Sequence, residues 1–155
     1  MEQETMIIIP VKSAESGQFR EILVEYWRDL VPDAPFLKDP IVAEAQFNQR
    51  YRWSGGSNNP FWAIVDGHRF GFFMYRIYDD HVTAYIHDFF VKPAARRQRH
   101  GTEMYRQLLT LLKVKGIAQI GLSVLEDNPT ALSFWREQGF EIEYHRLSQR
   151  IDTLS

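Results

Sequence analysis

Residues 91–102 read VKPAARRQRHGT, and residues 128–140 read NPTALSFWREQGF. Together these two stretches decide the fold of the chain. In the first stretch, the apolar residue before Pro93 indicates the end of a strand, and an arginine-rich turn then leads into an amphipathic helix. A turn between a strand and a helix gathers backbone N–H groups whose dipoles favour an anion, and arginine adds charge-assisted donors. The stretch therefore predicts a phosphate-binding turn.

The second stretch begins with Asn128 and Pro129, which are typical of a helix cap and a first helical residue. It ends with Gly139 and Phe140, which fit a left-handed helix stop with its hydrophobic contact. Taken singly, each of these features has that structural explanation. Their full spacing, one helix and one strand downstream of the arginine turn, is what points to a function.

Length and composition indicate one globular domain. The 155 residues suffice to bury about 70% of the unfolded surface, and hydrophobic residues at 45% and charged residues at 25% are ordinary values. A net charge of -2 argues against a general nucleic-acid binder, so the arginine run is either an anion site or a solvated turn. The lack of cysteine excludes disulfides, zinc–thiolate sites and thiol nucleophiles.

The sequence also bears on location and partners. Residues 1–5 are acidic and lack the basic region that begins a signal peptide, and no apolar run approaches the roughly 20 residues that span a bilayer. The five histidines lack metal-ligand spacing. We therefore expect a soluble, cytoplasmic protein with no metal and no nucleic-acid or membrane partner, and both a monomer and a homodimer stay open.

The first third of the chain predicts a strand, two helices and a loop. The apolar run 6–11 suits a first strand that Pro10 helps to end. Apolar residues at i, i+3, i+4 and i+7 predict a helix over 19–30, and a weaker pattern predicts a second over 40–51. Residues 54–60, which read SGGSNNP, predict a loop.

The remaining segments predict a sheet interrupted by helices. In chain order they are strands over 61–65 and 70–78 joined by a tight turn at Asp66-Gly67, a strand over 82–91, a helix that contains 104–112 and ends at Gly116, a strand over 119–124, a short helix after Asn128, and a last strand over 141–151. The predicted class is α/β (α+β), with a mixed, mostly antiparallel sheet of about six to seven strands flanked by about four helices.

This order of elements, and both stretches, resemble the GNAT superfamily of N-acetyltransferases. The family's first signature is Arg/Gln-x-x-Gly-x-Gly/Ala between a strand and a helix, a few residues after Val-x-Pro. Here Val91 and Pro93 precede Arg96-x-x-Arg99-x-Gly101, so Arg99 stands where the first glycine is expected. The resemblance implies a single GNAT domain over residues 1–155.

The second family signature is Asn-x-x-Ala followed by Tyr-x-x-x-Gly-Phe. This chain has Asn128 and Ala131, then Trp135 in the place of the tyrosine, then Gly139 and Phe140. Many relatives use that tyrosine as the acid that protonates the departing thiolate, and an indole N–H cannot play that part. A thiol has a pKa of about 8.5, so a thiolate leaves easily and a dedicated acid is not essential.

The resemblance implies acetyl-CoA as the acyl donor. The backbone amides of residues 97–102 would hold its pyrophosphate, and the end of the strand over 82–91 would pair its backbone with the pantetheine arm. Asn128 would contact the pantetheine from the other side. The residues expected to bind the cofactor are Phe89, Phe90, Val91, Arg96, Arg97, Gln98, Arg99, His100, Gly101, Thr102, Asn128 and Trp135.

Candidate catalytic residues follow from what acetyl transfer to an amine requires, namely a neutral amine and a stabilised oxyanion. His87 and Asp88 should lie on opposite faces of their strand, so only one can face the substrate directly. Because a carboxylate in this strand often serves relatives as the base, Asp88 is favoured. Glu126 is a further candidate that could attract a cationic amine, and Tyr144 is a candidate acid. Structural roles are the alternatives for all of them.

The leading hypothesis is an acetyl-CoA-dependent N-acetyltransferase that moves an acetyl group to a primary amine by direct attack in a ternary complex. Without cysteine, a thiol-linked acyl-enzyme cannot form. The alternative, suggested by Arg99 and Trp135, is a catalytically impaired acyl-CoA-binding regulatory or scaffold domain. A protein-interaction module is a third hypothesis. The sequence does not identify the acceptor amine.

Overall fold

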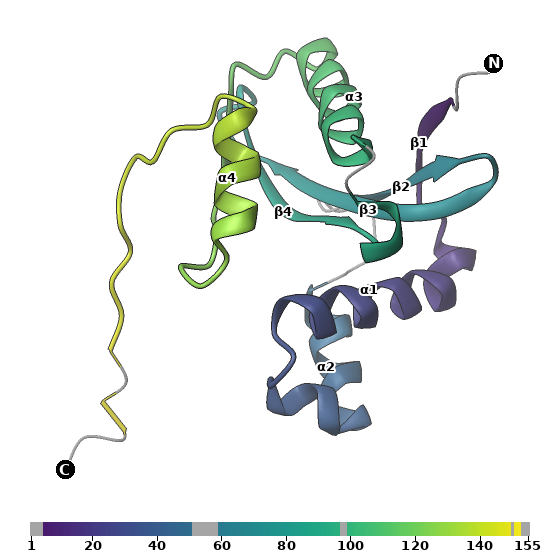
Figure 1. Cartoon of the computed structure of the whole chain (residues 1–155), viewed down its shortest axis with the longest axis vertical. Helices are drawn as coiled ribbons and strands as arrows, with labels where there is room; N and C mark the ends of the chain where they lie inside the picture. Colours follow the sequence, from purple (N-terminus) through teal and green to yellow (C-terminus); the bar gives the residue numbers. More distant parts are fainter. Residues whose placement is uncertain (1–4, 51–58, 97–98, 150, 153–155) are drawn as a thin grey trace. The chain divides into compact units, whose positions relative to one another are not determined.

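The computed structural model describes residues 5–50, 59–96, 99–149 and 151–152. The chain forms two compact units, residues 1–123 and residues 124–155 (Figure 1). The loop predicted over 54–60 lies mostly outside the described residues, and its last two residues begin a strand instead. Arg97 and Gln98 also lie outside them.

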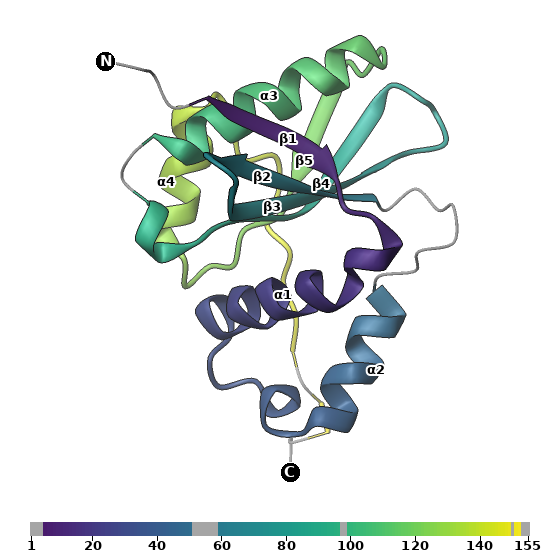
Figure 2. The ribbon, with the colours of Figure 1, turned by 90° about the vertical axis from the view of Figure 1, so that its right-hand side faces the viewer.

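The first unit holds a mixed sheet of five strands in the spatial order β1-β2-β3-β4-β5 (Figure 2). The first three pairs of neighbours are antiparallel, and β4 and β5 are parallel. The strands are β1 (Met6–Pro10), β2 (Asn59–Val65), β3 (His68–Ile77), β4 (Thr83–Val91) and β5 (Gln119–Leu122). The mixed, mostly antiparallel sheet was predicted correctly, but the described residues form five strands rather than six or seven.

The predicted helices are also confirmed. They are α1 (Ser16–Leu30), α2 (Pro40–Arg50), α3 (His100–Val114) and, in the second unit, α4 (Pro129–Glu137). Short 3-10 turns cover Ser13–Glu15 (η1), Pro35–Lys38 (η2) and Pro93–Ala95 (η3). None of the helices in the described part of the chain combines the length and the hydrophobicity that a membrane span requires.

Helices cover both faces of the sheet in the first unit, with α1 on one face and α3 on the other (Figure 2). The stripe predicted for α1 is its buried face, where Phe19 packs edge-on against Phe72 of β3 at 5.1 Å between ring centroids. Burial of such rings is the main stabilising contribution of this face. The core cluster on the α1 side consists of Val11, Phe19, Ile22, Leu23, Trp27, Phe47, Trp62, Phe72, Met74 and Phe90.

The hairpin of β2 and β3 turns where the Asp-Gly pair predicted it. Asp66 has φ 51° and Gly67 has φ 78°, so both residues take the left-handed conformation of a type I′ turn. The twist of this turn matches that of antiparallel strands, which is why a two-residue connection suffices.

In the second unit, α4 begins and ends as its sequence predicted. The Asn128 side chain accepts a hydrogen bond from the backbone N–H of Ala131 at 3.1 Å. At the other end Gly139 has φ 100°, and the Phe140 N–H donates to the Trp135 carbonyl at 3.1 Å while their rings lie 5.3 Å apart. This is a Schellman stop with its hydrophobic contact.

The strand expected over 141–151 does not form in the part of that range that the structure describes, residues 141–149 and 151. Residues 141–149 form no regular secondary structure and are exposed, as at Ile142 (48%) and Tyr144 (74%). Alternating apolar and polar residues only show that a segment can be extended, whereas a strand also needs a neighbour to complete its hydrogen-bond ladder.

Candidate functional site

The end of β4 extends beyond its pairing with β5. The parallel register ends at the pair Ile86–Leu122, while β4 continues to Val91. On its other side β4 stays attached to β3, and the Lys92 N–H donates to the Phe70 carbonyl at 2.8 Å. The last part of β4 is the segment predicted to pair with pantetheine, and an extended ligand can add to such a segment through backbone hydrogen bonds.

A bulge lies within β4, next to the candidate base. The register with β3 steps from Met74–Asp88 to Tyr75–Ile86 and so passes over His87. Asp88 is buried, with 2% of its surface exposed, whereas His87 is half-buried and meets the ring of Tyr85 at 5.0 Å. Bulges of this kind redirect side chains, and they are frequent beside active sites.

Arg96 fixes the segment that follows β4. Its Nε–H donates to the carbonyl of Val91 at 2.8 Å, and its Nη2 lies 2.6 Å from Oδ2 of Asp29 on α1. The guanidinium also lies 5.7 Å from the centre of the Phe90 ring. The arginine side chain therefore folds back over β4 and closes the short segment of residues 91–96.

His100 holds the start of α3 against the same segment. Its Nδ1 lies 3.0 Å from the carbonyl oxygen of Ala95, and because a carbonyl only accepts, this nitrogen carries the proton. The imidazole also meets the ring of Phe70 on β3 at 4.8 Å. Both contacts keep the entrance of α3 close to the end of β4.

Arg99 occupies the cap position of α3 in the left-handed conformation, with φ 63° and ψ 13°. Its carbonyl accepts from the N–H of Glu103 at 3.0 Å and so begins the helix. A left-handed residue other than glycine costs about 1 kcal/mol. Glycine, which the signature has at this position, takes such a conformation without that cost.

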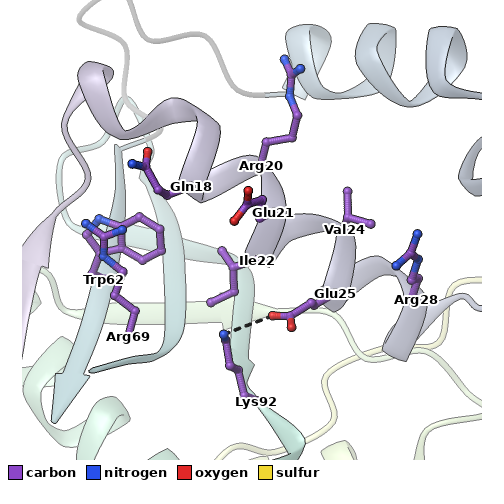
Figure 3. A pocket seen from close by; sticks show the side chains of 10 residues that line it. All are labelled: Gln18, Arg20, Glu21, Ile22, Val24, Glu25, Arg28, Trp62, Arg69 and Lys92. Atoms are coloured by element: carbon purple, nitrogen blue, oxygen red, sulfur yellow. Dashed lines mark ion pairs between the residues drawn. The ribbon is translucent and has the colours of Figure 1, made fainter. Parts of the chain in front are cut away.

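A groove of about 570 Å³ runs beside α1 (Figure 3). Lys92 and Glu25, which both line it, form an ion pair at 3.4 Å, and Arg69 of its lining pairs with Glu15, which lies outside the lining. The backbone N–H of Lys12, at 2.9 Å, is the largest cause that lowers the pKa of Glu15, and the charge of Arg69 adds to it. The lining residues are Gln18, Arg20, Glu21, Ile22, Val24, Glu25, Arg28, Trp62, Arg69 and Lys92, so the groove lies away from the β5 side of β4.

In the first unit Phe89 and Gly101 are half-buried and Thr102 is exposed. The remaining predicted site residues belong to the second unit. Glu126 is exposed, Tyr144 is 74% exposed, and the side chain of Asn128 caps α4. Trp135 is buried, with 7% of its surface exposed, and packs edge-on against Phe134 at 4.8 Å. Their roles stay predictions. Within the described parts of the chain, no group of three or more His, Cys, Asp or Glu residues is placed to hold a metal ion.

Sequence reasoning missed three features of the site. The contact of Asp29 with Arg96 joins residues 67 positions apart, and no local pattern indicates it. The hydroxyl of Tyr85 donates to Oγ of Ser123 at 2.6 Å and so links β4 to the end of β5. Gly71 lies opposite Val91 and admits the close approach of β4, a role that a glycine inside an apolar run could have suggested.

Known structures share this fold over nearly the whole chain. The Bacillus subtilis protein YycN has a TM-score of 0.76 at 14% identity, over 95% of this chain and 99% of its own. The aminoglycoside N-acetyltransferase AAC(6')-Iy in complex with CoA has a TM-score of 0.65 at 17% identity, over 96% of both chains. A ribosomal-protein-alanine N-acetyltransferase from Brucella melitensis has a TM-score of 0.69 at 14% identity, over 95% of this chain and 100% of its own.

Structural likeness at such low sequence identities shows the fold alone, whereas a match to a family model shows the family. No curated protein matches the chain. The model of the acetyltransferase (GNAT) family matches residues 18–140, which make up more than half of the chain and run across both units. The matched range contains the arginine turn and the second signature in full. The chain therefore belongs to the acetyltransferase (GNAT) family.

Proposed function

We propose that the chain is an acetyl-CoA-dependent N-acetyltransferase that transfers an acetyl group to a primary amine within a ternary complex. One observation carries the proposal: β4 continues past its last pair with β5, and Arg99, at the glycine position of the signature, takes a left-handed conformation that favours glycine. Membership of the family supports the same activity. The proposal treats residues 1–155 as one catalytic domain.

Donor binding would use backbone more than side chains. The amides of residues 97–102 would hold the pyrophosphate, because the first N–H groups of a helix lack acceptors within the helix and attract anions. The cations of Arg97 and Arg99 would add to this field. The backbone of residues 89–91 would pair with pantetheine, and Asn128 and Trp135 would contribute contacts from the second unit.

In the proposed reaction the amine nitrogen attacks the carbonyl carbon of the thioester, and the C–N bond forms as an oxyanion develops. The C–S bond then breaks and CoA leaves as a thiolate. Asp88 would take the proton that the amine loses, directly or through water, and Glu126 would attract the amine as a cation. Tyr144 or solvent would protonate the thiolate. The chain has no cysteine, so the acetyl group does not pass through a thiol of the enzyme.

A second candidate function is acyl-CoA binding without turnover. The observation that favours it is Trp135, which fills the position of the family's acidic tyrosine and serves in the Schellman stop of α4. Such a domain would bind CoA and act as a regulator or scaffold. Turnover separates the two functions, because a scaffold releases no free CoA from acetyl-CoA with any amine.

The test is a binding titration followed by an acceptor screen. Calorimetry should show CoA binding, and Gly101→Glu should abolish it by placing a negative side chain beside the pyrophosphate. Release of free thiol from acetyl-CoA should then be followed with amino acids, polyamines, aminoglycosides and peptide N-termini, two of which are acceptor classes that the names of similar structures suggest. No heat and no thermal shift at millimolar CoA would overturn the proposal.

A further inference from the structure

Arg96 opens the phosphate-turn signature, yet its side chain is already engaged within the protein. We propose that Arg96 serves the donor site as a positioning residue held by Asp29 of α1, and that its guanidinium does not bind the phosphates of CoA. This inference rests on the proposed CoA site and adds Asp29, on a different element, to the residues that shape it.

The contacts of the guanidinium account for its orientation. Nε–H donates to the carbonyl of Val91 at 2.8 Å, while Nη2 and Nη1 lie 2.6 Å and 3.5 Å from the two carboxylate oxygens of Asp29. A guanidinium is a planar fork, so a carboxylate that holds its outer nitrogens also sets the direction of Nε. Asp29 therefore aims Arg96 at the last residue of β4.

The place of the Arg96–Val91 contact in the chain determines how it would affect the binding of CoA. Val91 is the last residue of β4, in the segment where pantetheine would pair, and Arg96 precedes the amides that would hold the pyrophosphate. By closing residues 91–96 on themselves, the arginine fixes the spacing between these two parts of the donor site. The nearby 3-10 turn adds a second constraint, since the Arg96 N–H donates to the carbonyl of Pro93 at 3.2 Å.

One turn earlier on α1, Glu25 provides a natural comparison. Its carboxylate pairs with the ammonium of Lys92 at 3.4 Å, as Figure 3 shows, and so also ties α1 to the segment after β4. Both pairs are partly exposed, with side-chain exposures of 39% and 52% for Lys92 and Glu25, and of 42% and 39% for Arg96 and Asp29. Exposed pairs contribute little to stability, so variants at either position should fold.

The two roles of Arg96 predict opposite effects of removing Asp29. If Arg96 binds phosphate, Asp29 competes for it, and Asp29→Asn should tighten CoA binding. If Arg96 positions β4, the same substitution should weaken CoA binding about tenfold, the ratio expected for one hydrogen bond to a charged group. Glu25→Gln removes an equal charge from the same helix and should leave the affinity for CoA within about twofold. It therefore controls for the long-range electrostatic effect of removing one negative charge from α1.

Calorimetric titration of CoA into wild type, Asp29→Asn, Asp29→Glu and Glu25→Gln tests this, with thermal unfolding as the check on folding. Weakening confined to Asp29→Asn, with affinity restored in Asp29→Glu, is the expected result. Tighter binding by Asp29→Asn, or equal affinities in all four proteins, would overturn the inference while leaving the proposed function standing. Absence of CoA binding in the wild type would overturn both.

Salt dependence supplies a readout that a purely structural residue does not change. Arg96→Gln should weaken CoA binding while its dependence on salt stays that of the wild type, whereas Arg99→Ala should flatten that dependence by removing a cation near phosphate. Arg96→Lys keeps the charge but loses the fork, so it should bind CoA as weakly as Arg96→Gln. Wild-type affinity in Arg96→Lys, or a flattened salt dependence in Arg96→Gln, would show that Arg96 binds phosphate.

Discussion

The carbonyl oxygen of Phe90 on β4 occupies the space that a Cβ atom would take at Gly71 on β3. Nearby, the register of β2 and β3 steps from Ala63–Gly71 to Ile64–Arg69, so β3 bulges beside this glycine. The bulge and the missing side chain let β4 approach closely where it enters the donor site. Gly71 thus shapes that site without being expected to contact a ligand.

We predict that Gly71→Ala displaces the end of β4. The new methyl group has no space, so the free energy of unfolding should fall by about 1–3 kcal/mol, the usual cost of overpacking. CoA binding should weaken as well, because the displaced carbonyl belongs to the segment that would pair with pantetheine. Gly121→Ala on β5 is the control, since its methyl would meet Tyr85 at an ordinary 3.7 Å. Equal urea-unfolding energies for both variants would contradict this account.

Arg99→Gly should separate stability from binding. Glycine takes φ 63° without strain, so the variant should be more stable by about 1 kcal/mol, whereas Arg99→Ala keeps the strained backbone and should gain nothing. Both variants lose the cation and should bind CoA more weakly by about 1–2 kcal/mol. Chemical unfolding and calorimetry measure the two effects. A glycine variant that binds CoA more tightly would show that Arg99 obstructs the turn.

Asp88→Asn should abolish most of the catalysis while leaving CoA binding in place. If Asp88 is the base, kcat/KM should fall by about 10²–10⁴-fold, the usual contribution of general-base catalysis. Because Asp88 is buried, circular dichroism and a CoA titration should accompany the steady-state kinetics to confirm folding. A correctly folded Asp88→Asn protein with near wild-type kcat/KM would remove Asp88 from the mechanism.

Trp135→Phe should behave in the opposite way. The indole N–H is no proton donor at neutral pH, and the ring packs against Phe134 and Phe140. Phenylalanine preserves much of this packing, so most of kcat should remain while the KM for acetyl-CoA rises. Steady-state kinetics with acetyl-CoA as the varied substrate measures the change. A large loss of kcat at unchanged KM would give Trp135 a chemical role.

Glu15 should make stability depend on pH on the acidic side. Its pKa lies below its ordinary value of 4.5 in the folded protein, chiefly through the backbone N–H of Lys12. A carboxyl group whose pKa is lower in the folded than in the unfolded protein stabilises the fold at pH values above its unfolded pKa. This stabilisation is lost as the pH falls through the folded pKa. Glu15→Gln should therefore be less stable than wild type at about pH 7, and the difference should shrink at about pH 3.

Urea unfolding of both proteins across this range measures the effect, and Arg69→Gln refines it. Removing the Arg69 cation should reduce the pH dependence without abolishing it, because the hydrogen bond from Lys12 remains. If the free energies of unfolding of wild type and Glu15→Gln differ by the same amount at every pH, ionisation of Glu15 does not contribute to the pH dependence of stability.

The sequence predicted those parts of the fold that local patterns determine. The helical stripe of α1, the Asp66-Gly67 turn and the two ends of α4 all follow from residue spacing or from a conformation that one residue type favours. The strand expected over 141–151 shows the limit, because alternation describes a segment and its pairing depends on another one.

The candidate site could be predicted only in part, for a related reason. Its main segments, the end of β4 and the arginine turn, were predicted because the signature is local. The bulge at His87, the pairing of Asp29 with Arg96 and the close approach at Gly71 all depend on how segments pack against one another, which no local pattern shows. The left-handed backbone of Arg99 was not predicted either, although its place at the glycine position of the signature was noted.

The parallel pairing of β4 and β5 also bears on the order in which the chain folds. Short turns join β2, β3 and β4. By contrast, Thr83 of β4 pairs with Gln119 of β5 across a connection that contains the whole of α3. Contacts of large sequence separation form late, because loop closure must precede them. Pulse-labelled hydrogen exchange should therefore show that the backbone amides of β2, β3 and β4 are protected before those of β5. Simultaneous protection would contradict this order.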